Sequence, residues 1–133
     1  MPILKISKNA ILQSQLLPDD YYKAKCIAID LEESKDKKSK NFVYQFELEV
    51  DGRVMKVYVN INPADNSIWP MSIPMMEILE GRKFKDPQNM DIDTDNHVGK
   101  KCQVKIEQKP YEGRLVNNIT EFLPYDREAV GAF

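Results

Sequence analysis

The residues of this sequence that could do chemistry are basic and aromatic. Lysines can follow a phosphate backbone and tyrosine rings can stack on bases, the combination that binds a single strand without sequence preference. Such residues occur between the first two predicted strands, on the third strand and in the last predicted hairpin. The candidate nucleic-acid-binding residues are Lys35, Lys37, Lys38, Lys40, Lys56, Tyr58, Lys109, Tyr111 and Arg114.

Two observations oppose this prediction. The net charge is −2, so any attraction to nucleic acid or to an anionic membrane must come from segregated positive charge. Glu47 and Glu49 are expected on the outer face of the second strand, beside the predicted groove. A lysine-rich loop can serve solubility alone, and Tyr58 and Tyr111 can simply cover apolar neighbours. Both interpretations stay open.

The sequence offers no catalytic set. The only histidine, His97, lies in a polar segment without a serine or cysteine paired to it. Nucleophilic catalysis needs a base beside the nucleophile and a group that orients the base. We therefore expect His97 to be solvated and the protein not to be an enzyme.

An aspartate run at residues 91–95 begins like a calcium loop. Asn96 stands where the glycine of such a loop belongs, and Cys102 stands where its bidentate glutamate belongs. One histidine and two distant cysteines do not form a tetrahedral zinc set. We expect a solvated acidic loop, no metal and no cofactor. Cys26 and Cys102 lie inside predicted strands, which predicts buried free thiols.

Three consecutive strands are predicted over residues 21–31, 42–50 and 54–61. The apolar side of the first changes midway, which predicts a β-bulge near Ile27. The second and third alternate with period 2, the pattern of half-buried strands, and Asp51-Gly52 predicts a tight turn between them. The residues expected to face the core are Phe42, Tyr44, Phe46, Leu48, Val50, Met55, Val57, Val59 and Ile61.

Two further strands and a helix complete the predicted fold. Residues 101–106 form the fourth strand, residues 110–113 a hairpin turn, and residues 114–123 the fifth strand, with a bulge at Asn117 and Asn118. A helix is predicted over residues 74–80, with Ser72 as its cap and Gly81 as its stop. Trp69 is expected to plug the end of a barrel beside this helix.

This order predicts an all-β protein: a five-stranded OB-type Greek-key barrel with one short helix between strands 3 and 4. The length favours one domain over residues 1–133. Residues 1–18 are expected to pack across the barrel as a short strand and a turn of helix, and residues 125–133 to form a short mobile tail. No signal-peptide pattern and no membrane-length apolar stretch are present, so a cytoplasmic protein without a membrane partner is expected.

Short motifs spread over residues 17–124 carry a resemblance to a known family. They are Leu17-Pro18 to Tyr22, the lysine-rich loop from Glu33 to Lys40, Val98-Gly99-Lys100-Lys101, the hairpin from Lys109 to Arg114, and Phe122-Leu123-Pro124. Together they resemble a family of small phage-encoded OB-fold proteins associated with single-stranded DNA.

The resemblance implies single-stranded DNA binding in phage replication or recombination, in the cytoplasm of an infected host cell, with phage replication or recombination proteins as partners. Asn41 stands where the family commonly has a glycine. The tail also departs from the acidic tail of many phage-type binders, since Arg127 offsets Asp126 and Glu128.

Three hypotheses follow. The first is sequence-tolerant binding of single-stranded DNA, which should show one positive groove across the first and last hairpins. The alternative is an OB-fold protein–protein interaction module without nucleic-acid binding, built on Trp69, the methionine-rich helix and the tail; it should show an exposed apolar patch. A weaker third is a small hydrolase or metal-dependent nuclease built on the aspartates. The sequence leaves DNA versus RNA and the oligomeric state open.

Overall fold

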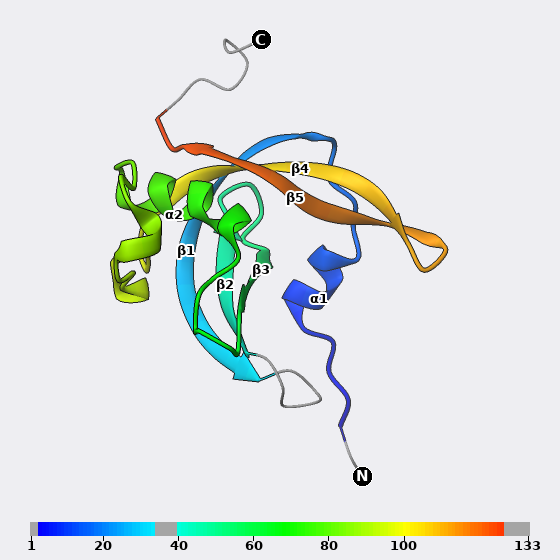
Figure 1. The fold of residues 1–133 in the computed structure, drawn as a ribbon. Coiled ribbons are helices and arrows are strands. Elements are labelled where there is room, and N and C mark those ends of the chain that lie inside the picture. The colour runs from blue at the N-terminus through cyan, green and yellow to red at the C-terminus, as the bar shows by residue number, and fades with distance from the viewer. Residues whose placement is uncertain (1–2, 34–39, 127–133) are drawn as a thin grey trace.

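The computed structural model describes residues 3–33 and 40–126 and folds them around one antiparallel β-sheet. The strand order is β3-β2-β1-β4-β5, so β1 is central and β3 and β5 are the edges. Figure 1 shows a strongly curved sheet with α2 beside its concave side. The strands are β1 (Asp20–Glu33), β2 (Lys40–Leu48), β3 (Val54–Ile61), β4 (Lys101–Tyr111) and β5 (Arg114–Pro124).

The predicted five-stranded, mostly β fold is confirmed, but the predicted barrel closure is not. A closed barrel leaves no strand edge unpaired. Here β3 pairs with β2 and β5 pairs with β4, and no pairing joins β3 to β5 in the described part of the chain. The sheet is therefore open at these two strands.

Short helices occupy the segments outside the sheet. They are α1 (Lys8–Gln13), η1 (Pro70–Ser72), α2 (Ile73–Glu80), η2 (Pro87–Asn89) and η3 (Thr94–Asn96). α2 matches the predicted helix to within one residue. Gly81 ends it with φ 72°, a left-handed conformation that glycine adopts without steric cost. Ser72 precedes α2 but makes no side-chain cap hydrogen bond, so its predicted capping role is wrong. No helix among the described residues is long and apolar enough to cross a membrane.

The predicted bulge in β1 is confirmed. The pairing of β1 with β2 shifts between Cys26 and Ala28, which leaves Ile27 as the extra residue. Ala24 and Cys26 are fully buried before the bulge, and Ile29 packs against the core after it. Because side chains alternate with period 2, one extra residue moves the inward set to the other parity.

The turn between β2 and β3 is longer than predicted. β2 ends at Leu48, so Val50 lies in the turn with 59% of its surface exposed instead of facing the core. Gly52 has φ 78° and lies in this turn, as the Asp51-Gly52 dipeptide predicted. The β5 bulge is also displaced. Lys105 pairs with Glu121 and Ile106 with Ile119, so the extra residue is Thr120 and not the predicted asparagine pair.

The core lies between the concave side of the sheet and α2. Its buried residues come from the central strands and from α2. Burial of these apolar side chains is the dominant favourable contribution to folding. The remaining predicted inward positions of β2 and β3 are confirmed as buried or packed against this core. Its members include Ala24, Cys26, Tyr44, Phe46, Leu48, Met55, Val59, Met75, Met76, Leu79, Cys102, Val104 and Ile106.

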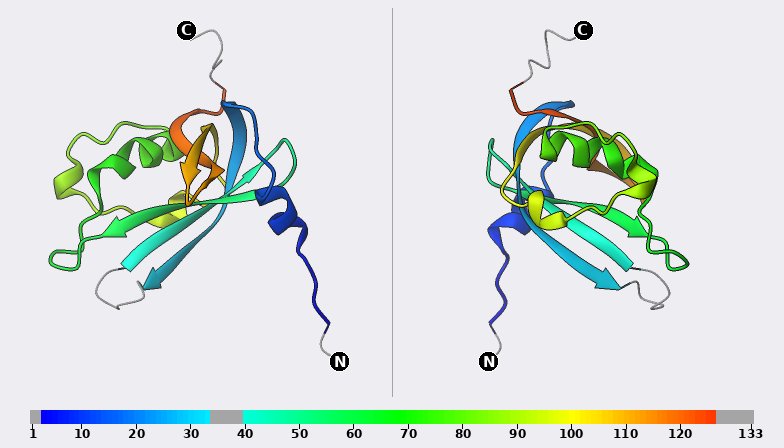
Figure 2. Two further views of the ribbon diagram at one scale, coloured as in Figure 1. Left: turned by 90° about the vertical axis from the view of Figure 1, so that its right-hand side faces the viewer. Right: turned by 60° about the vertical axis from the view of Figure 1, so that its left-hand side comes forward.

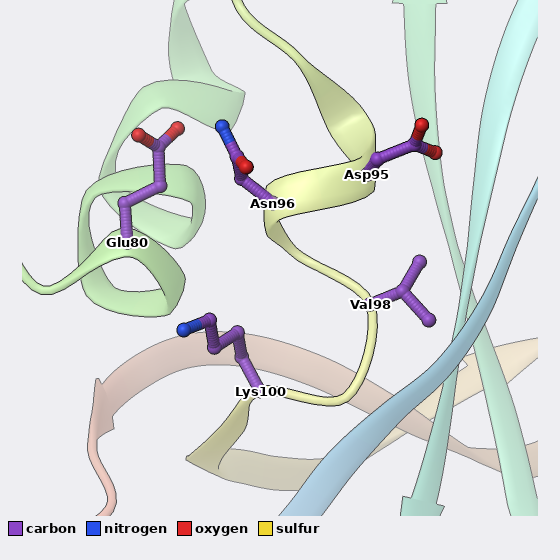
Figure 3. A pocket seen from close by; sticks show the side chains of 5 residues that line it. All are labelled: Glu80, Asp95, Asn96, Val98 and Lys100. Carbon is purple, nitrogen blue, oxygen red and sulfur yellow. The ribbon is translucent and has the colours of Figure 1, made fainter.

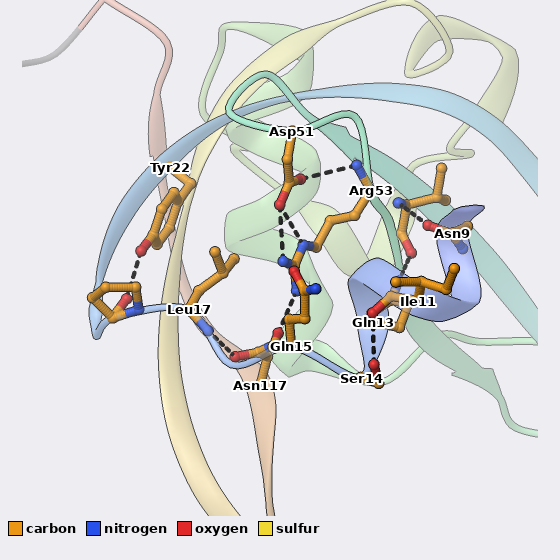
Figure 4. A network of polar contacts seen from close by, with 12 residues as sticks. Asn9, Ile11, Gln13, Ser14, Gln15, Leu17, Tyr22, Asp51, Arg53 and Asn117 are labelled. Atoms are coloured by element: carbon orange, nitrogen blue, oxygen red, sulfur yellow. Dashed lines mark hydrogen bonds and ion pairs between the residues drawn. The ribbon is translucent and has the colours of Figure 1, made fainter. Parts of the chain in front are cut away.

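The N-terminal segment attaches to the edge strand β3 through α1 (Figure 4). Asn9 Oδ1 accepts a hydrogen bond from the Val54 N–H at 2.8 Å, and Gln13 Nε2 donates to the Val54 carbonyl. Asn9 and Gln13 are one helical turn apart and so reach the same strand residue. They satisfy both backbone groups that Val54 turns toward the open edge.

The same segment continues to the opposite side of the opening. Asn117 of β5 accepts from the Leu17 N–H at 2.9 Å, and Gln108 of β4 donates to the Leu17 carbonyl at 2.8 Å. Arg53, 1% exposed, pairs with Asp51 at 2.8 Å and donates to the Gln15 carbonyl at 2.8 Å. Residues 8–19 thus bridge the two sheet edges, which do not pair with each other.

Candidate nucleic-acid interface

Lys56 and Tyr58 lie together on the convex face of the sheet. Tyr58 is 58% exposed while its neighbour Val59 is fully buried, so the outward direction of Tyr58 predicted from alternation is correct. Lys56 precedes it by two residues and faces the same side. A base could reach this tyrosine ring from solvent.

The surroundings of Tyr58 are less basic than the prediction required. Across the strands, Tyr58 pairs with Val43 and Val43 pairs with Asp30, so an aspartate lies on the same face two strands away. Asp30 accepts a hydrogen bond from Gln45 at 2.6 Å, and Glu47 is directly opposite Lys25. The convex face therefore carries both signs of charge around Tyr58.

The last hairpin is exposed but lies apart from Tyr58. Tyr111 pairs with Arg114 across the turn, and the Tyr111 side chain is 53% exposed. Glu112 and Gly113 form the turn with φ of 49° and 80°, which matches the twist of a two-residue hairpin. Lys109 is exposed on the same hairpin. In Figure 1 the hairpin tip projects away from β3, so the structure does not join the two predicted clusters into one groove.

The lysine-rich loop cannot be placed against either cluster. Lys35, Lys37 and Lys38 lie outside the described residues. Lys40 is the first residue of β2, is exposed, and pairs with Ile61 at the far end of β3.

A cluster that the sequence prediction missed lies on the central strands: Lys23, Lys25, Lys101 and Tyr125, here called the lysine–tyrosine patch. Lys25 and Lys101 are directly opposite each other on β1 and β4, and Lys23 lies two residues before Lys25 on the same face of β1. Lys23 Nζ lies 4.8 Å from the centre of the Tyr125 ring, and Lys101 Nζ lies 5.2 Å from it. Within the described part of the chain, none of these three lysines forms an ion pair.

Tyr125 is held over the sheet by hydrogen bonds. Gln103 of β4 lies directly opposite Lys23. It donates to the carbonyls of Pro124 and Tyr125 at 3.0 and 3.2 Å. A hydrogen bond with Glu49, together with burial, raises the pKa of the Tyr125 hydroxyl. Tyr125 was assigned to a mobile tail in the sequence, and the pairing of β1 with β4 was not predicted, so neither half of the patch was found.

The concave side holds a buried polar network. His97 is fully buried, so the prediction of a solvated histidine is wrong. Its Nδ1 lies 2.6 Å from the Tyr44 hydroxyl and its Nε2 lies 2.7 Å from Glu80 Oε2. Arg82 pairs with the other oxygen of Glu80 at 2.9 Å. Both ring nitrogens of His97 therefore have partners, and the ring links the sheet to the end of α2.

Burial shifts the pKa values of this region. It raises the pKa of Tyr44 well above its usual value. For Glu80 burial acts in the same direction, but hydrogen bonds to His97 and Arg82 outweigh it and lower the pKa. Cys26 and Cys102 are free, buried thiols, as predicted, and burial raises their pKa values to about 11 and about 12. Such thiols are poor nucleophiles at neutral pH.

A hollow of about 390 Å³ lies beside this network. Figure 3 shows its lining: Glu80 from α2 and Asp95, Asn96, Val98 and Lys100 from the segment that leads into β4. Asp93 accepts a hydrogen bond from the Asp95 N–H at 3.0 Å, so one aspartate of the predicted acidic loop shapes the turn. In the parts of the chain that the structure describes, no three histidine, cysteine or acidic side chains group closely enough to hold a metal.

Trp69 does not plug the fold. It is 59% exposed, and Met71 is 79% exposed. The predicted plug is therefore wrong. The methionines of α2 show the opposite environment, since Met75 and Met76 are 2% and 1% exposed and belong to the core. An interaction surface built on the helix methionines is excluded, whereas Trp69 and Met71 remain accessible.

The chain matches no family model, and a search of curated proteins finds no match.

Proposed function

We propose that this protein binds single-stranded DNA without sequence preference, through the convex face of the sheet. The observation that carries the proposal is the lysine–tyrosine patch. Lys23 and Lys101, on adjacent strands, both lie over the Tyr125 ring, and Lys25 is directly opposite Lys101. None of the three lysines forms an ion pair within the described chain. Lysines at such spacing can follow phosphates, while Tyr125 and the exposed Tyr58 can stack on bases.

The fold gives the proposal secondary support. A five-stranded sheet whose first strand pairs with the second and the fourth, with a helix between β3 and β4, is the arrangement expected of an OB-type domain. A role in phage replication or recombination remains part of the proposal and is carried by the sequence resemblance alone.

Charge predicts how such binding should behave. With a net charge of −2, the molecule as a whole does not attract DNA, so affinity depends on a few lysine–phosphate contacts. Each such contact on a single strand adds about −0.7 to the slope of log affinity against log salt. Binding should therefore be modest and should weaken steadily as salt rises.

Fluorescence anisotropy with a labelled oligothymidine over a salt series tests the proposal. The double variant Lys23→Gln/Lys101→Gln should flatten the slope by up to ~1.4, since it removes two phosphate contacts. Tyr125→Ala should weaken binding by ~1–3 kcal/mol and leave the slope nearly unchanged, because stacking releases few ions. Changing Lys35, Lys37, Lys38 and Lys40 to glutamine should flatten the slope by up to ~3 if all four contact phosphates.

The matched control is Lys83→Gln/Lys85→Gln, which removes the same charge from two exposed lysines outside the patch. The control should keep the parent slope. If the patch variant also keeps the parent affinity and slope, the convex face does not bind DNA.

The exposed pair Trp69 and Met71 favours a second candidate, a protein–protein interaction module. Oligothymidine binding by wild type and by Trp69→Ala distinguishes the two functions. Trp69→Ala should leave oligothymidine binding unchanged under the first proposal. If wild-type protein shows no salt-dependent binding of oligothymidine at all, the interaction module becomes the better description.

A further inference from the structure

The free edge of β3 has a short stretch of unpaired backbone groups at Lys56 and Tyr58, here called the slot. In an antiparallel pair, alternate residues turn their N–H and C=O groups toward the partner strand, and the others turn them away. Leu48 N–H bonds to the Arg53 carbonyl, which fixes the alternation along β3. Val54, Lys56, Tyr58 and Asn60 therefore direct their backbone groups toward the open edge.

The two ends of this edge are already occupied. Asn9 and Gln13 take both groups of Val54, and the Trp69 N–H donates to the Asn60 carbonyl at 3.2 Å. Between them, the N–H and C=O of Lys56 and Tyr58 have no partner within the described chain. Unpaired edge groups of this kind are a template for another extended segment.

The chain also has an extended segment without a partner. Residues 3–6, here called the N-terminal arm, precede α1 and form no helix or strand. Ile3, Leu4 and Ile6 are 81%, 94% and 78% exposed. A cluster of exposed large apolar residues is uncommon in a monomer and marks a contact with something else.

The arm does not point at its own slot. Figures 1 and 2 show it leaving α1 away from β3 and away from the body of the molecule. In the left view of Figure 2, β3 runs to one side and the arm to the other. The slot that the arm can enter is therefore that of another molecule.

We propose that the N-terminal arm of one copy adds as a short strand to the Lys56–Tyr58 edge of a second copy. The four residues of the arm match a slot blocked at Val54 and at Asn60. Alternation places Leu4 and Ile6 on one side and Lys5 on the other. With Leu4 and Ile6 toward the core side, they lie beside Val57 and extend the apolar face.

Charge selects the position along the edge. Like charges directly opposite each other on neighbouring strands are unfavourable. Lys5 therefore pairs with Tyr58 and not with Lys56, and its ammonium can lie against the tyrosine ring. The arm thus meets the edge in one preferred register.

Sedimentation velocity over a range of protein concentrations tests the self-association. Wild-type protein should form species larger than the 15.4 kDa chain as concentration rises. Lys5→Pro removes one backbone donor from a segment outside every helix and strand, so it should raise the dissociation constant at least about tenfold without affecting the fold. Lys5→Ala keeps the backbone donor and should weaken association far less than Lys5→Pro, because it removes only the contact of the ammonium with the Tyr58 ring. A wild-type protein that stays monomeric, or a proline variant that associates equally well, overturns the proposal.

Disulfide trapping distinguishes a second copy from the chain's own edge. Lys5→Cys and Tyr58→Cys proteins are mixed and oxidised; Cys26 and Cys102 are buried and do not compete. A disulfide between the two different variants supports the proposal, and Lys5→Cys mixed with Lys83→Cys should give far less product. If the double variant Lys5→Cys/Tyr58→Cys instead forms only an internal disulfide, the arm covers its own edge and the proposal is wrong.

Discussion

The two faces of the sheet combine tyrosines with charged residues in opposite ways. On the concave side, Tyr44, His97 and Glu80 are connected by hydrogen bonds of 2.6 and 2.7 Å and are shielded from water. On the convex side, Lys23 and Lys101 approach the Tyr125 ring but form no ion pair with a described residue. Buried polar groups are costly unless paired, so the first group is committed to the fold. Solvated lysines cost the fold little, so the second remains available to a ligand.

The largest expected effect is on the concave side. His97→Ala should lower the free energy of unfolding by about 2–4 kcal/mol, because Tyr44 and Glu80 would each lose a buried partner. Asp95→Ala, in the same segment but exposed, should change it by less than about 0.5 kcal/mol. Urea denaturation measures both. Equal stabilities of the two variants would show that the histidine network is not structural.

Ionisation of Glu80 should affect how the free energy of unfolding changes at acidic pH. Its folded-state pKa is lowered, so its ionised form stabilises the native protein above the unfolded-state value of 4.5, and this contribution is lost as pH falls through the folded-state pKa. The stability difference between wild type and Glu80→Gln should therefore shrink as pH is lowered from 6 toward 3. Other carboxylates titrate in both proteins and cancel in the comparison. A difference that stays constant over this range would contradict the lowered pKa.

Trp69 should behave as a surface residue. The sequence predicted a barrel plug, whose loss would cost about 3–5 kcal/mol. With 59% of its surface exposed, Trp69→Ala should instead lower the unfolding free energy by less than about 1.5 kcal/mol. Thermal unfolding distinguishes the loss expected for a plug from the loss expected for a surface residue. Phe46→Ala, which removes a fully buried side chain, is measured alongside Trp69→Ala as the reference for a large loss. A loss as large as that of Phe46→Ala would restore the plug.

The smallest effect on stability should come from the convex face. Lys23→Gln/Lys101→Gln should change the unfolding free energy by less than about 0.5 kcal/mol, since solvated lysines contribute little to folding. The same variant is the one expected to change the salt dependence of DNA binding. A large stability loss would mean that the contacts with Tyr125 are structural, and would remove the contrast between the faces.

The sequence by itself determined the local structure. Alternation located the β-strands and the inward positions of β2 and β3, apart from Val50. The shift of apolar parity found the bulge at Ile27, and Gly81 marked the end of α2. These signals are local, because period-2 alternation, a bulge and a left-handed cap each depend on a few neighbouring residues.

Only the tertiary structure decided which side chains are available. His97 was predicted to be solvated but is buried, and Trp69 was predicted to be buried but is exposed. Both predictions failed because burial depends on which distant segment packs on a residue. Lys25 and Lys101 are more than seventy positions apart in the sequence and became neighbours only through the pairing of β1 with β4. The open edge of β3 likewise exists because residues 8–19, and not β5, bridge the sheet. Contacts between distant residues follow from strand pairing and packing, and a pattern read along one stretch of chain does not contain them.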